Sequence, residues 1–236
     1  MFENFQFKQV EPYQFKGFTF PVYASIKIDG ELNYWTGEYL LNKYGTKREF
    51  PPLKGFPPLY GELYYNEGKD FYEALKYLKN GSEFLKFAIF PHQPISDTTT
   101  SPQKHPNLTI LEAKKIQNLK ALEDFYYRTI EEGYEGIVIK APEGMYKAKR
   151  NYEDVFFITG VRKRKWSVVV GRREREDLGH CSLMGWDNLW EMIKKEEIIG
   201  QDKKNYYITP KIKVEVRFLG WAKDKLRHPR IKKLML

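Results

Sequence analysis

The stretch Ala24-Ser25-Ile26-Lys27-Ile28-Asp29-Gly30 places one lysine in a short run of small and apolar residues that ends in Asp-Gly. The run predicts a strand, and Asp-Gly predicts the turn that closes it. A protonated lysine is a poor nucleophile, with a reference pKa of about 10.4, so a reactive lysine needs nearby cations or desolvation. The apolar neighbours of Lys27 favour desolvation. Because so short a pattern also arises by chance, the rest of the sequence must support it.

The residues around this stretch predict a first half of mostly β structure with two helices. Runs rich in Tyr, Phe, Val and Ile predict strands, and apolar residues at helical spacing predict the helices. A later run, Glu135 to Lys140, is typical of a buried strand with a charge at each end. The strands are predicted at residues 22–28, 31–35, 59–65 and 84–90, and the helices at 70–79 and 119–131.

The composition changes from residue 161 onwards, where Arg and Lys become dense. Strands predicted at 168–170, 180–184 and 211–218, with a helix at 187–195, indicate a small unit of mostly β character. We therefore expect an α+β protein of two domains. Residues 1–165 would contain antiparallel sheets with flanking helices, and residues 166–236 would form a small β-barrel.

The charge balance favours a polyanionic partner. Forty Lys and Arg residues against thirty-one Asp and Glu leave a formal charge of +9, although a lysine-rich surface also serves solubility or heat resistance. The single cysteine, Cys181, excludes an intrachain disulfide and a cysteine-built zinc site, which favours a cytoplasmic location. The sequence predicts neither a signal peptide nor a membrane span, and we expect a monomer.

Several segments, taken in order, resemble motifs of the covalent nucleotidyltransferases, above all the ATP-dependent DNA ligases. The ordered set is harder to produce by chance than any single segment. The resemblance implies that residues 1–165 form a nucleotidyltransferase (adenylation) domain. The segments at 168–171, 178–183 and 214–229 resemble the OB-fold barrel of those ligases. The first-domain segments are Lys27-Ile28-Asp29-Gly30, Asn42-Lys43-Tyr44-Gly45, Tyr60-Gly61-Glu62-Leu63, Phe87-Ala88-Ile89-Phe90, Glu135-Gly136-Ile137-Val138-Ile139-Lys140 and Arg162-Lys163-Arg164-Lys165.

The resemblance implies a role for each matched residue. Lys27 would carry AMP, and Asp29 would act in the later steps on DNA. The paired lysines Lys163 and Lys165 would hold phosphate during catalysis. The other implied roles are a divalent metal, Mg²⁺ or Mn²⁺, at Glu135 and Glu62; ATP at Ser25, Ile26, Lys43, Glu62, Phe90 and Lys140; and nucleic acid at Arg162, Arg172, Arg173, Arg175 and Arg227.

Other interpretations of some residues stay open. Lys147 and Lys149 compete with Lys163 and Lys165 for the role of the paired lysines. Glu62 is also interpretable as a strand-surface carboxylate, and Phe90 as a core residue.

The chain departs from the family pattern at several positions. Leu32 and Lys43 stand where many ligases have Arg, and Pro91 stands where they usually have Asp. The family's closing basic motif is expected to be missing, with Lys232 and Lys233 as its nearest remnants.

The predicted function is that of an ATP-dependent DNA ligase in DNA replication and repair. It would seal nicks in double-stranded DNA through a lysyl-AMP intermediate and an adenylated 5′-phosphate. The alternatives are an RNA ligase, another covalent nucleotidyltransferase, and a catalytically inactive relic that grips nucleic acid by its basic barrel. An NAD-dependent ligase is disfavoured because few residues precede Lys27 and the zinc cysteines of that family are absent.

Overall fold

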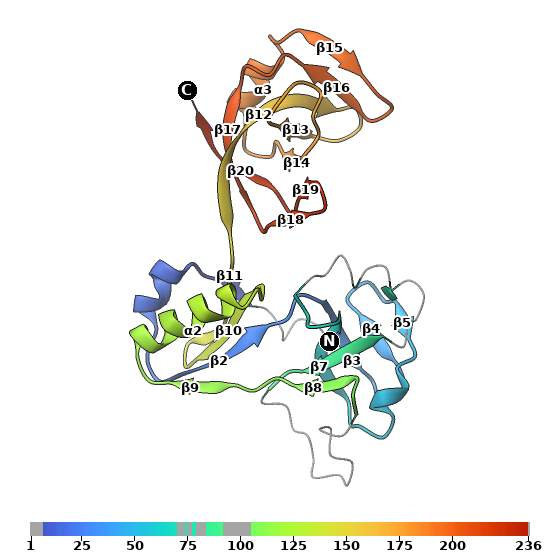
Figure 1. The fold of residues 1–236 in the computed structure, drawn as a ribbon, viewed down its shortest axis with the longest axis vertical. Coiled ribbons are helices and arrows are strands. Elements are labelled where there is room, and N and C mark those ends of the chain that lie inside the picture. The colour runs from blue at the N-terminus through green and yellow to red at the C-terminus, as the bar shows by residue number, and fades with distance from the viewer. Residues whose placement is uncertain (1–6, 70–73, 75–76, 79–83, 92–104, 236) are drawn as a thin grey trace. The chain divides into compact units, whose positions relative to one another are not determined.

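The computed structural model describes residues 7–69, 74, 77–78, 84–91 and 105–235. The chain divides into two compact units, Met1–Arg150 and Asn151–Leu236 (Figure 1). The division lies earlier in the chain than the boundary expected after residue 165. The reason is strand β12 (Tyr152–Arg162), which pairs along its length with three other strands of the second unit.

The first unit contains a five-stranded sheet with Lys27 at the end of one strand. Its order is β1-β11-β10-β2-β9, antiparallel except where β1 pairs with β11. Helix α2 begins after Asn118, whose side chain caps it, and packs with the 3₁₀ helix η2 on one face of the sheet. The elements are β1 (Lys8–Gln9), η2 (Pro12–Gly17), β2 (Val22–Lys27), β9 (Lys114–Ile116), α2 (Leu119–Glu131), β10 (Gly136–Ala141) and β11 (Gly144–Lys149).

A six-stranded sheet completes the first unit. Its order is β5-β4-β3-β6-β7-β8, and within this sheet the described pairs are antiparallel except β7 with β8. One face buries Trp35, Leu40, Leu63 and Phe87. The elements are β3 (Glu31–Trp35), β4 (Leu40–Asn42), β5 (Lys47–Arg48), η3 (Pro51–Leu53), β6 (Leu59–Tyr65), β7 (Leu85–Ile89) and β8 (Leu108–Ile110).

The second unit contains a seven-stranded sheet and a separate two-stranded sheet, and its own core includes Phe156, Val168, Leu189 and Val214. The path of the seven-stranded sheet is β14-β13-β12-β16-β15, with β17 also paired to β12 and β20 paired to β17; the pairing among described residues does not close a barrel. The elements are β12, β13 (Ser167–Gly171), β14 (Gly179–Ser182), α3 (Asp187–Ile193), β15 (Ile198–Gln201), β16 (Asn205–Ile208), β17 (Lys213–Phe218), β18 (Trp221–Ala222), β19 (Lys225–Leu226) and β20 (Arg230–Met235).

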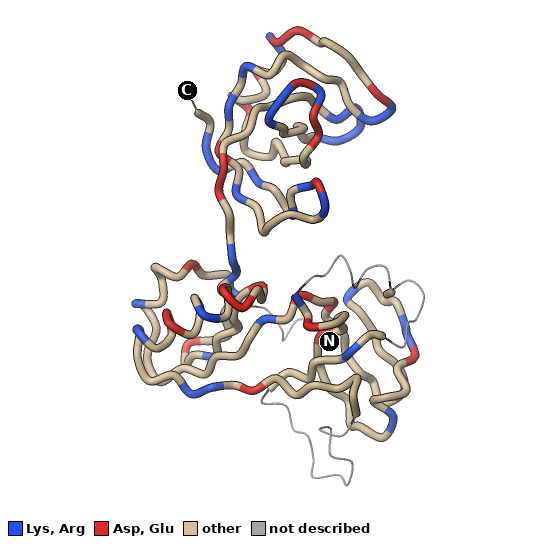
Figure 2. Tube along the Cα trace, in the orientation of Figure 1, with Lys and Arg blue, Asp and Glu red and all other residues tan. Residues whose placement is uncertain are grey.

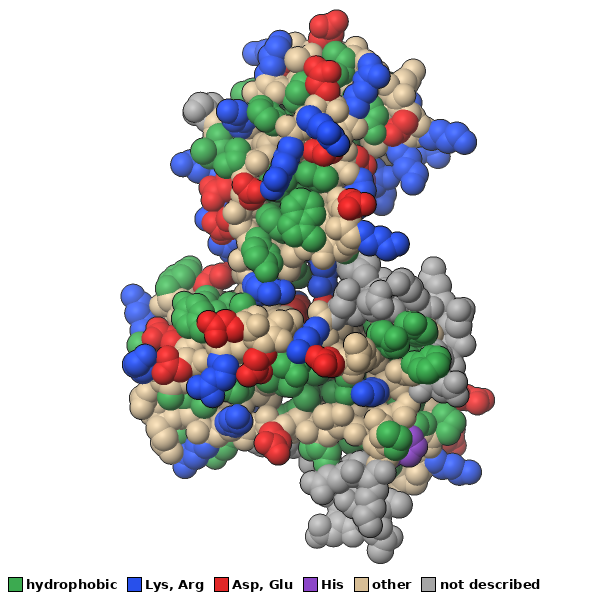
Figure 3. All heavy atoms as spheres, viewed as in Figure 1, with side chains coloured by type: hydrophobic (Ala, Val, Ile, Leu, Met, Phe, Trp, Pro, Cys, Tyr) green, Lys and Arg blue, Asp and Glu red, His purple; other side chains and the backbone are tan. Residues whose placement is uncertain are grey.

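Sheets therefore dominate both units, and helices are few. The strands predicted in the first half correspond to β2, β3, β6 and β7, and the helix at 119–131 is α2. The helix expected at 70–79 lies mostly outside the described residues. Lys and Arg recur along the strands and turns of the second unit (Figure 2), and their side chains stand on its visible surface (Figure 3). No described helix is long and apolar enough to cross a membrane.

Candidate active site

Lys27 is the last residue of β2, and the register of the sheet decides what surrounds it. Lys27 pairs with Gly136 of β10, which pairs on its other side with Lys149 of β11. Directly paired residues of antiparallel strands project to the same face, so Lys27 and Lys149 share a face with only a glycine between them. The opposite face carries Ile137 and Ala148, which are buried against α2.

Two glutamates approach the Lys27 ammonium. Its Nζ lies 2.6 Å from Oε2 of Glu135 and 3.6 Å from Oε1 of Glu62. Glu135, one residue before β10, also forms an ion pair with Nζ of Lys149. The side chains of Lys27, Glu62 and Glu135 expose only 14%, 11% and 9% of their surface. Because water is largely excluded, these charges act on one another more strongly than they would on a surface.

Burial and neighbouring charges oppose each other in the pKa of each group. Desolvation would lower the pKa of Lys27, but Glu62 and Glu135 outweigh it and hold that pKa above its ordinary value. Desolvation would raise the pKa of Glu135, but Lys27 and Lys149 lower it to about 2. For Glu62, desolvation prevails and the pKa is raised. Lys27 is therefore a protonated ammonium paired with an ionised Glu135, which is its resting rather than its nucleophilic form.

Close approach around Lys27 requires glycine at two positions. A Cβ atom at Gly30 would lie 2.6 Å from the carbonyl oxygen of Leu63 and 2.8 Å from Cγ of Glu62. Gly136 has a φ angle of +154°, and a Cβ there would overlap the carbonyl oxygen of Ala148. These glycines allow Glu62 and strand β11 to come close to the nucleophile.

Two more predicted residues lie beside Lys27. Ser25 is buried and pairs with Val138, and because it precedes Lys27 by two residues its side chain lies on the same face. Asp29 is buried after the end of β2, and its backbone N–H donates to the carbonyl of Gly68 at 2.7 Å. The structure therefore brings Ser25 and Asp29 to the site.

Phe90 combines features of both interpretations. Its backbone N–H donates to the carbonyl of Tyr60 at 3.2 Å, and its half-buried side chain packs with Ile26 on a cluster that contains Ile28 and Ala88. Because Ile26 precedes Lys27 in β2, this packing holds Phe90 against the strand of Lys27. Phe90 is thus part of this small core without being fully buried.

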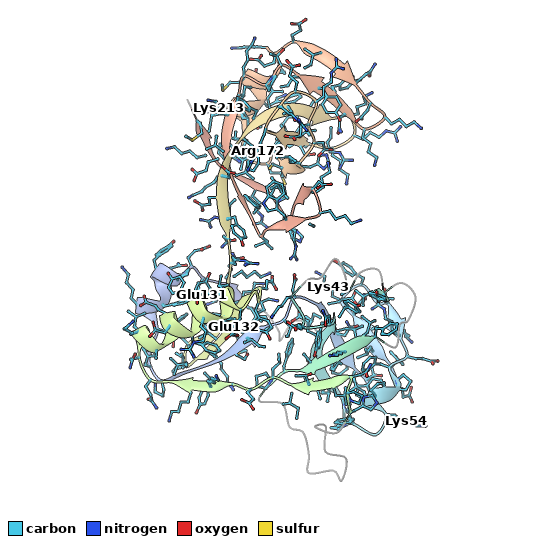
Figure 4. All side chains as sticks on the ribbon, viewed as in Figure 1. Lys43, Lys54, Glu131, Glu132, Arg172 and Lys213 are labelled. Atoms are coloured by element: carbon cyan, nitrogen blue, oxygen red, sulfur yellow. The ribbon has the colours of Figure 1, made fainter. Side chains whose placement is uncertain are left out.

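Lys140 and Lys43 lie in different settings. Lys140 is exposed at the far end of β10, and alternation along the strand places it on the face of Lys27. Lys43 follows β4 in an exposed turn (Figure 4), and its Nζ lies 4.9 Å from the centre of the Tyr44 ring. The side-chain oxygen of Asn42 accepts hydrogen bonds from two backbone N–H groups of this turn. Within the described contacts, none joins Lys43 to the other predicted residues.

One of the two candidate lysine pairs lies at the nucleophile. Lys147 pairs with Val138 of β10, so Lys147 and Lys149 both share the face of Lys27. Desolvation, helped by the charges of Lys149 and Lys27, lowers the pKa of Lys147, as expected for a lysine close to other cations.

The other pair lies in the second unit. Lys163 and Lys165 follow β12, and Nζ of Lys163 donates to the side-chain oxygen of Gln201 at 2.7 Å. Lys163 and Lys165 therefore belong to the second unit. Within the first unit, the strand pairing of β11 with β10, and of β10 with β2, places Lys147 and Lys149 on the face of Lys27.

Two carboxylates beside Lys27 have the chemistry to bind a divalent metal. Glu62 and Glu135 converge on one point, the Nζ of Lys27. Among the described residues, no group of three or more His, Cys, Asp and Glu side chains is arranged to hold a metal ion. Two carboxylates fit Mg²⁺, because this ion is usually bound by one or two carboxylates together with substrate phosphates and waters.

The arginines predicted to bind nucleic acid differ in availability. Arg172, which is labelled in Figure 4, pairs with Asp154 at 2.8 Å, and Arg175 donates to the carbonyl of Ile199 at 2.6 Å. Arg173 exposes 85% of its side chain and lies 3.4 Å from a glutamate. Arg173 is thus freer to move to a new partner than the other two. Arg162 is half-buried at the end of β12, and the half-buried Arg227 follows β19.

Two tyrosines near Glu62 were not singled out from the sequence. Tyr34 pairs in register with Tyr60, and their ring centroids are 4.6 Å apart. Because Tyr60 precedes Glu62 by two residues, both tyrosines share the face of Glu62. The period-two alternation in β3 and β6 is the signal that identifies this face.

Comparisons with known proteins were consistent with the motifs. Residues 77–156 match the family model described as the ATP dependent DNA ligase domain, which confirms the predicted resemblance; this segment contains Glu135 and Lys149 but not Lys27. No curated protein matches the sequence.

Solved structures share the fold of the whole chain. One comes from a structure–function analysis of Lig E DNA ligases, which concerns DNA binding with a minimal scaffold. It matches with a TM-score of 0.68 and 14% sequence identity, and the match covers 98% of this chain and 99% of that chain. Pmar-Lig_PreS3 and Pmar-Lig_Pre give TM-scores of 0.65 and 0.64 at 18% and 19% identity, each covering 96% of this chain and 66% and 67% of theirs.

Proposed function

We propose that this chain, an ATP-dependent DNA ligase, seals nicks in double-stranded DNA with Lys27 as the residue that carries AMP. The observation behind the choice of Lys27 is its Nζ, 2.6 Å from Glu135 and 3.6 Å from Glu62, on the face that carries Lys147 and Lys149. Phosphoryl transfer depends mainly on positioning and on neutralising charge. A nucleophile surrounded by lysines and carboxylates meets both needs.

The reaction proceeds in three transfers. The deprotonated Nζ of Lys27 attacks the α-phosphorus of ATP, so that a nitrogen–phosphorus bond forms and pyrophosphate leaves. The 5′-phosphate at the nick then attacks the same phosphorus, which moves AMP onto the DNA and frees Lys27. Finally the 3′-hydroxyl attacks the 5′-phosphate, loses its proton, and displaces AMP. Asp29, buried next to Lys27, is the carboxylate assigned to these later steps.

The first transfer requires Lys27 to lose its proton. Glu135 and Glu62 oppose this loss, because their charges stabilise the ammonium form. Carboxylates that hold a divalent cation no longer stabilise the ammonium, and this is the chemistry that Mg²⁺ or Mn²⁺ supplies when bound at Glu62 and Glu135. Lys147 and Lys149 then favour the neutral amine by charge repulsion.

The remaining first-unit residues are assigned to ATP. Lys147 and Lys149 hold phosphate oxygens, in the role that the motifs first assigned to Lys163 and Lys165. Lys140, exposed on the same face, extends this cationic surface. Ser25 and the backbone of Ile26 lie beside the nucleophile for base recognition, and the exposed part of Phe90 stacks on the base. Lys43 stays a candidate for phosphate or ribose.

The second unit is assigned to DNA as an OB-fold. Two features support this assignment. The long strand β12 pairs with β13 on one edge and with β16 and β17 on the other, and Lys and Arg recur along the second unit. Arg162, Arg173 and Arg227 are candidates for phosphate contacts. Arg172 and Arg175 must leave their present partners, Asp154 and the carbonyl of Ile199, to join them.

The test is transfer of label from ATP to the protein. Wild-type protein, incubated with α-labelled ATP and Mg²⁺ and separated by denaturing electrophoresis, should carry the label. Lys27→Ala should not, whereas Lys54→Ala, which removes an exposed lysine elsewhere in the first unit, should label normally. Labelling of Lys27→Ala at the wild-type level would reject this nucleophile. Joining of a nicked duplex, assayed in parallel, tests the substrate.

A further inference from the structure

The second unit contains a cavity that the Lys27 site does not use. Its volume is about 260 Å³, and it lies beside the turn that joins β12 to β13. Cationic side chains, two indole rings and a hydroxyl converge on it. The lining includes Arg162, Lys163, Lys165, Trp166, Ser167 and Trp190.

Trp166 is held in place but remains half-exposed. Its backbone carbonyl accepts the N–H of Leu183 at 3.1 Å, and its ring lies 4.8 Å, centroid to centroid, from that of Trp190 on α3. Even so, 48% of Trp166 is accessible to solvent. An indole that is supported on one side and exposed elsewhere is a preformed stacking platform, because little rotamer freedom is lost when a ring packs on it.

The polar groups at the cavity are available for an anionic ligand. Within the described part of the chain, neither Arg162 nor Lys165 forms an ion pair. Both cations line the same cavity as Trp166, so they are placed to neutralise phosphates on either side of a base that packs on its ring.

We propose that this cavity binds one unpaired nucleotide of a DNA single strand. The base stacks on Trp166, and Arg162 and Lys165 neutralise the flanking phosphates. Stacking on an indole requires a free base face, which a base paired and stacked within a duplex does not offer. The inference rests on the proposed function only in taking DNA as the nucleic acid. Beyond the sealing of simple nicks, it predicts a preference for DNA with an overhang or a gap.

The experiment compares two ligands by fluorescence anisotropy: a labelled oligothymidylate and a labelled blunt duplex of equal length. Trp166→Ala should weaken binding of the single strand about tenfold, since stacking contributes roughly 1–3 kcal/mol per base. Binding of the blunt duplex should change less than about twofold on the same scale. Trp221→Ala is the matched control, because Trp221 is also exposed, at 46%, in the same unit. Trp166→Phe should retain most of the affinity.

Three results would overturn the proposal. Unchanged single-strand affinity of Trp166→Ala would exclude stacking at this ring. An equal loss on both ligands would show a general contact with DNA, and an equal loss in Trp221→Ala would show that any exposed indole suffices. Circular dichroism melting must show that Trp166→Ala is folded; if it is not, Trp166→Leu, which keeps an apolar side chain but no aromatic ring, provides the same comparison. Sealing of a plain nick by Trp166→Ala should stay normal, so a failure of ligation itself would be recognised separately.

Discussion

The Lys27 site and the basic surface of the second unit use similar residues under opposite conditions. At the site, Lys27, Glu62 and Glu135 are shielded from water and paired with one another, and the pKa values of all three are displaced. On the second unit, Arg173 exposes 85% of its side chain, and its Nε lies 3.4 Å from the carboxylate of Glu176. Buried charges control protonation and reactivity, whereas exposed charges are screened by salt and contribute mainly to binding of polyanions.

The largest expected effect separates the two lysine pairs. Lys147→Ala with Lys149→Ala should slow formation of the lysyl-AMP adduct about 10²- to 10³-fold, because phosphate would lose preorganised cations. Lys163→Ala with Lys165→Ala, the matched control, should leave adduct formation nearly unchanged. Single-turnover labelling with ATP measures both. If only the Lys163→Ala, Lys165→Ala variant labelled more slowly, Lys163 and Lys165 would be the pair that acts on the phosphates at Lys27.

The next effect concerns the carboxylate between two lysines. Glu135→Gln should lower the free energy of unfolding by about 3–5 kcal/mol, because Lys27 and Lys149 would keep buried charges without their partner. Glu153→Gln removes an exposed carboxylate that pairs with Arg217, and should cost much less. Urea unfolding measures both, and equal losses would contradict the contrast between the units.

The pH dependence of stability should follow the same carboxylate. The pKa of Glu135 falls from 4.5 to about 2 on folding, so its contribution is fully present above pH 4.5 and is lost as the pH falls towards 2. Wild-type protein should therefore lose more stability than Glu135→Gln across this window. Unfolding curves at several acidic pH values test the difference, and parallel losses would show that Glu135 is not the group responsible.

A smaller effect is expected from steric crowding beside Lys27. Gly30→Ala should destabilise the first unit by about 1–3 kcal/mol, because the added methyl would meet Leu63 and Glu62. Gly17→Ala is the control, since no atom lies within 4 Å of the Cβ that it would add. Thermal melting gives both values. Equal stability of the two variants would mean that the residues around Gly30 shift to accommodate the methyl group without a loss of unfolding free energy.

The smallest effect belongs to the exposed arginines. Arg173→Ala should reduce the slope of log affinity against log salt for nicked duplex by about 1, as expected for one phosphate contact. Arg172→Ala should change it less, because Arg172 already pairs with Asp154. Binding titrations at several salt concentrations decide this, and a larger change for Arg172 would mean that DNA displaces Asp154.

Local patterns were enough to predict the first-half strands, and the resemblance of ordered motifs supplied the candidate site residues. The run that ends in Lys27-Ile28-Asp29-Gly30 combines an apolar strand with a turn, and the strand after Glu135 has the same kind of local signature. Such signals survive in a single sequence because strand period and turn chemistry depend on neighbouring residues. The structure places Lys27, Glu62 and Glu135 together, as the ordered motifs implied.

Only tertiary structure decided that Lys147 and Lys149 share a face with Lys27. Lys147-Ala-Lys149 and Lys163-Arg-Lys165 have the same Lys-x-Lys spacing, so no local rule distinguishes them. The distinction lies in strand pairing: β11 joins the sheet of Lys27, whereas β12 belongs wholly to the second unit. A strand belongs to the sheet whose neighbouring strands satisfy its backbone hydrogen-bonding groups. Pairing between strands distant in sequence therefore decides which sheet β11 and β12 join, and it places the domain boundary at Arg150.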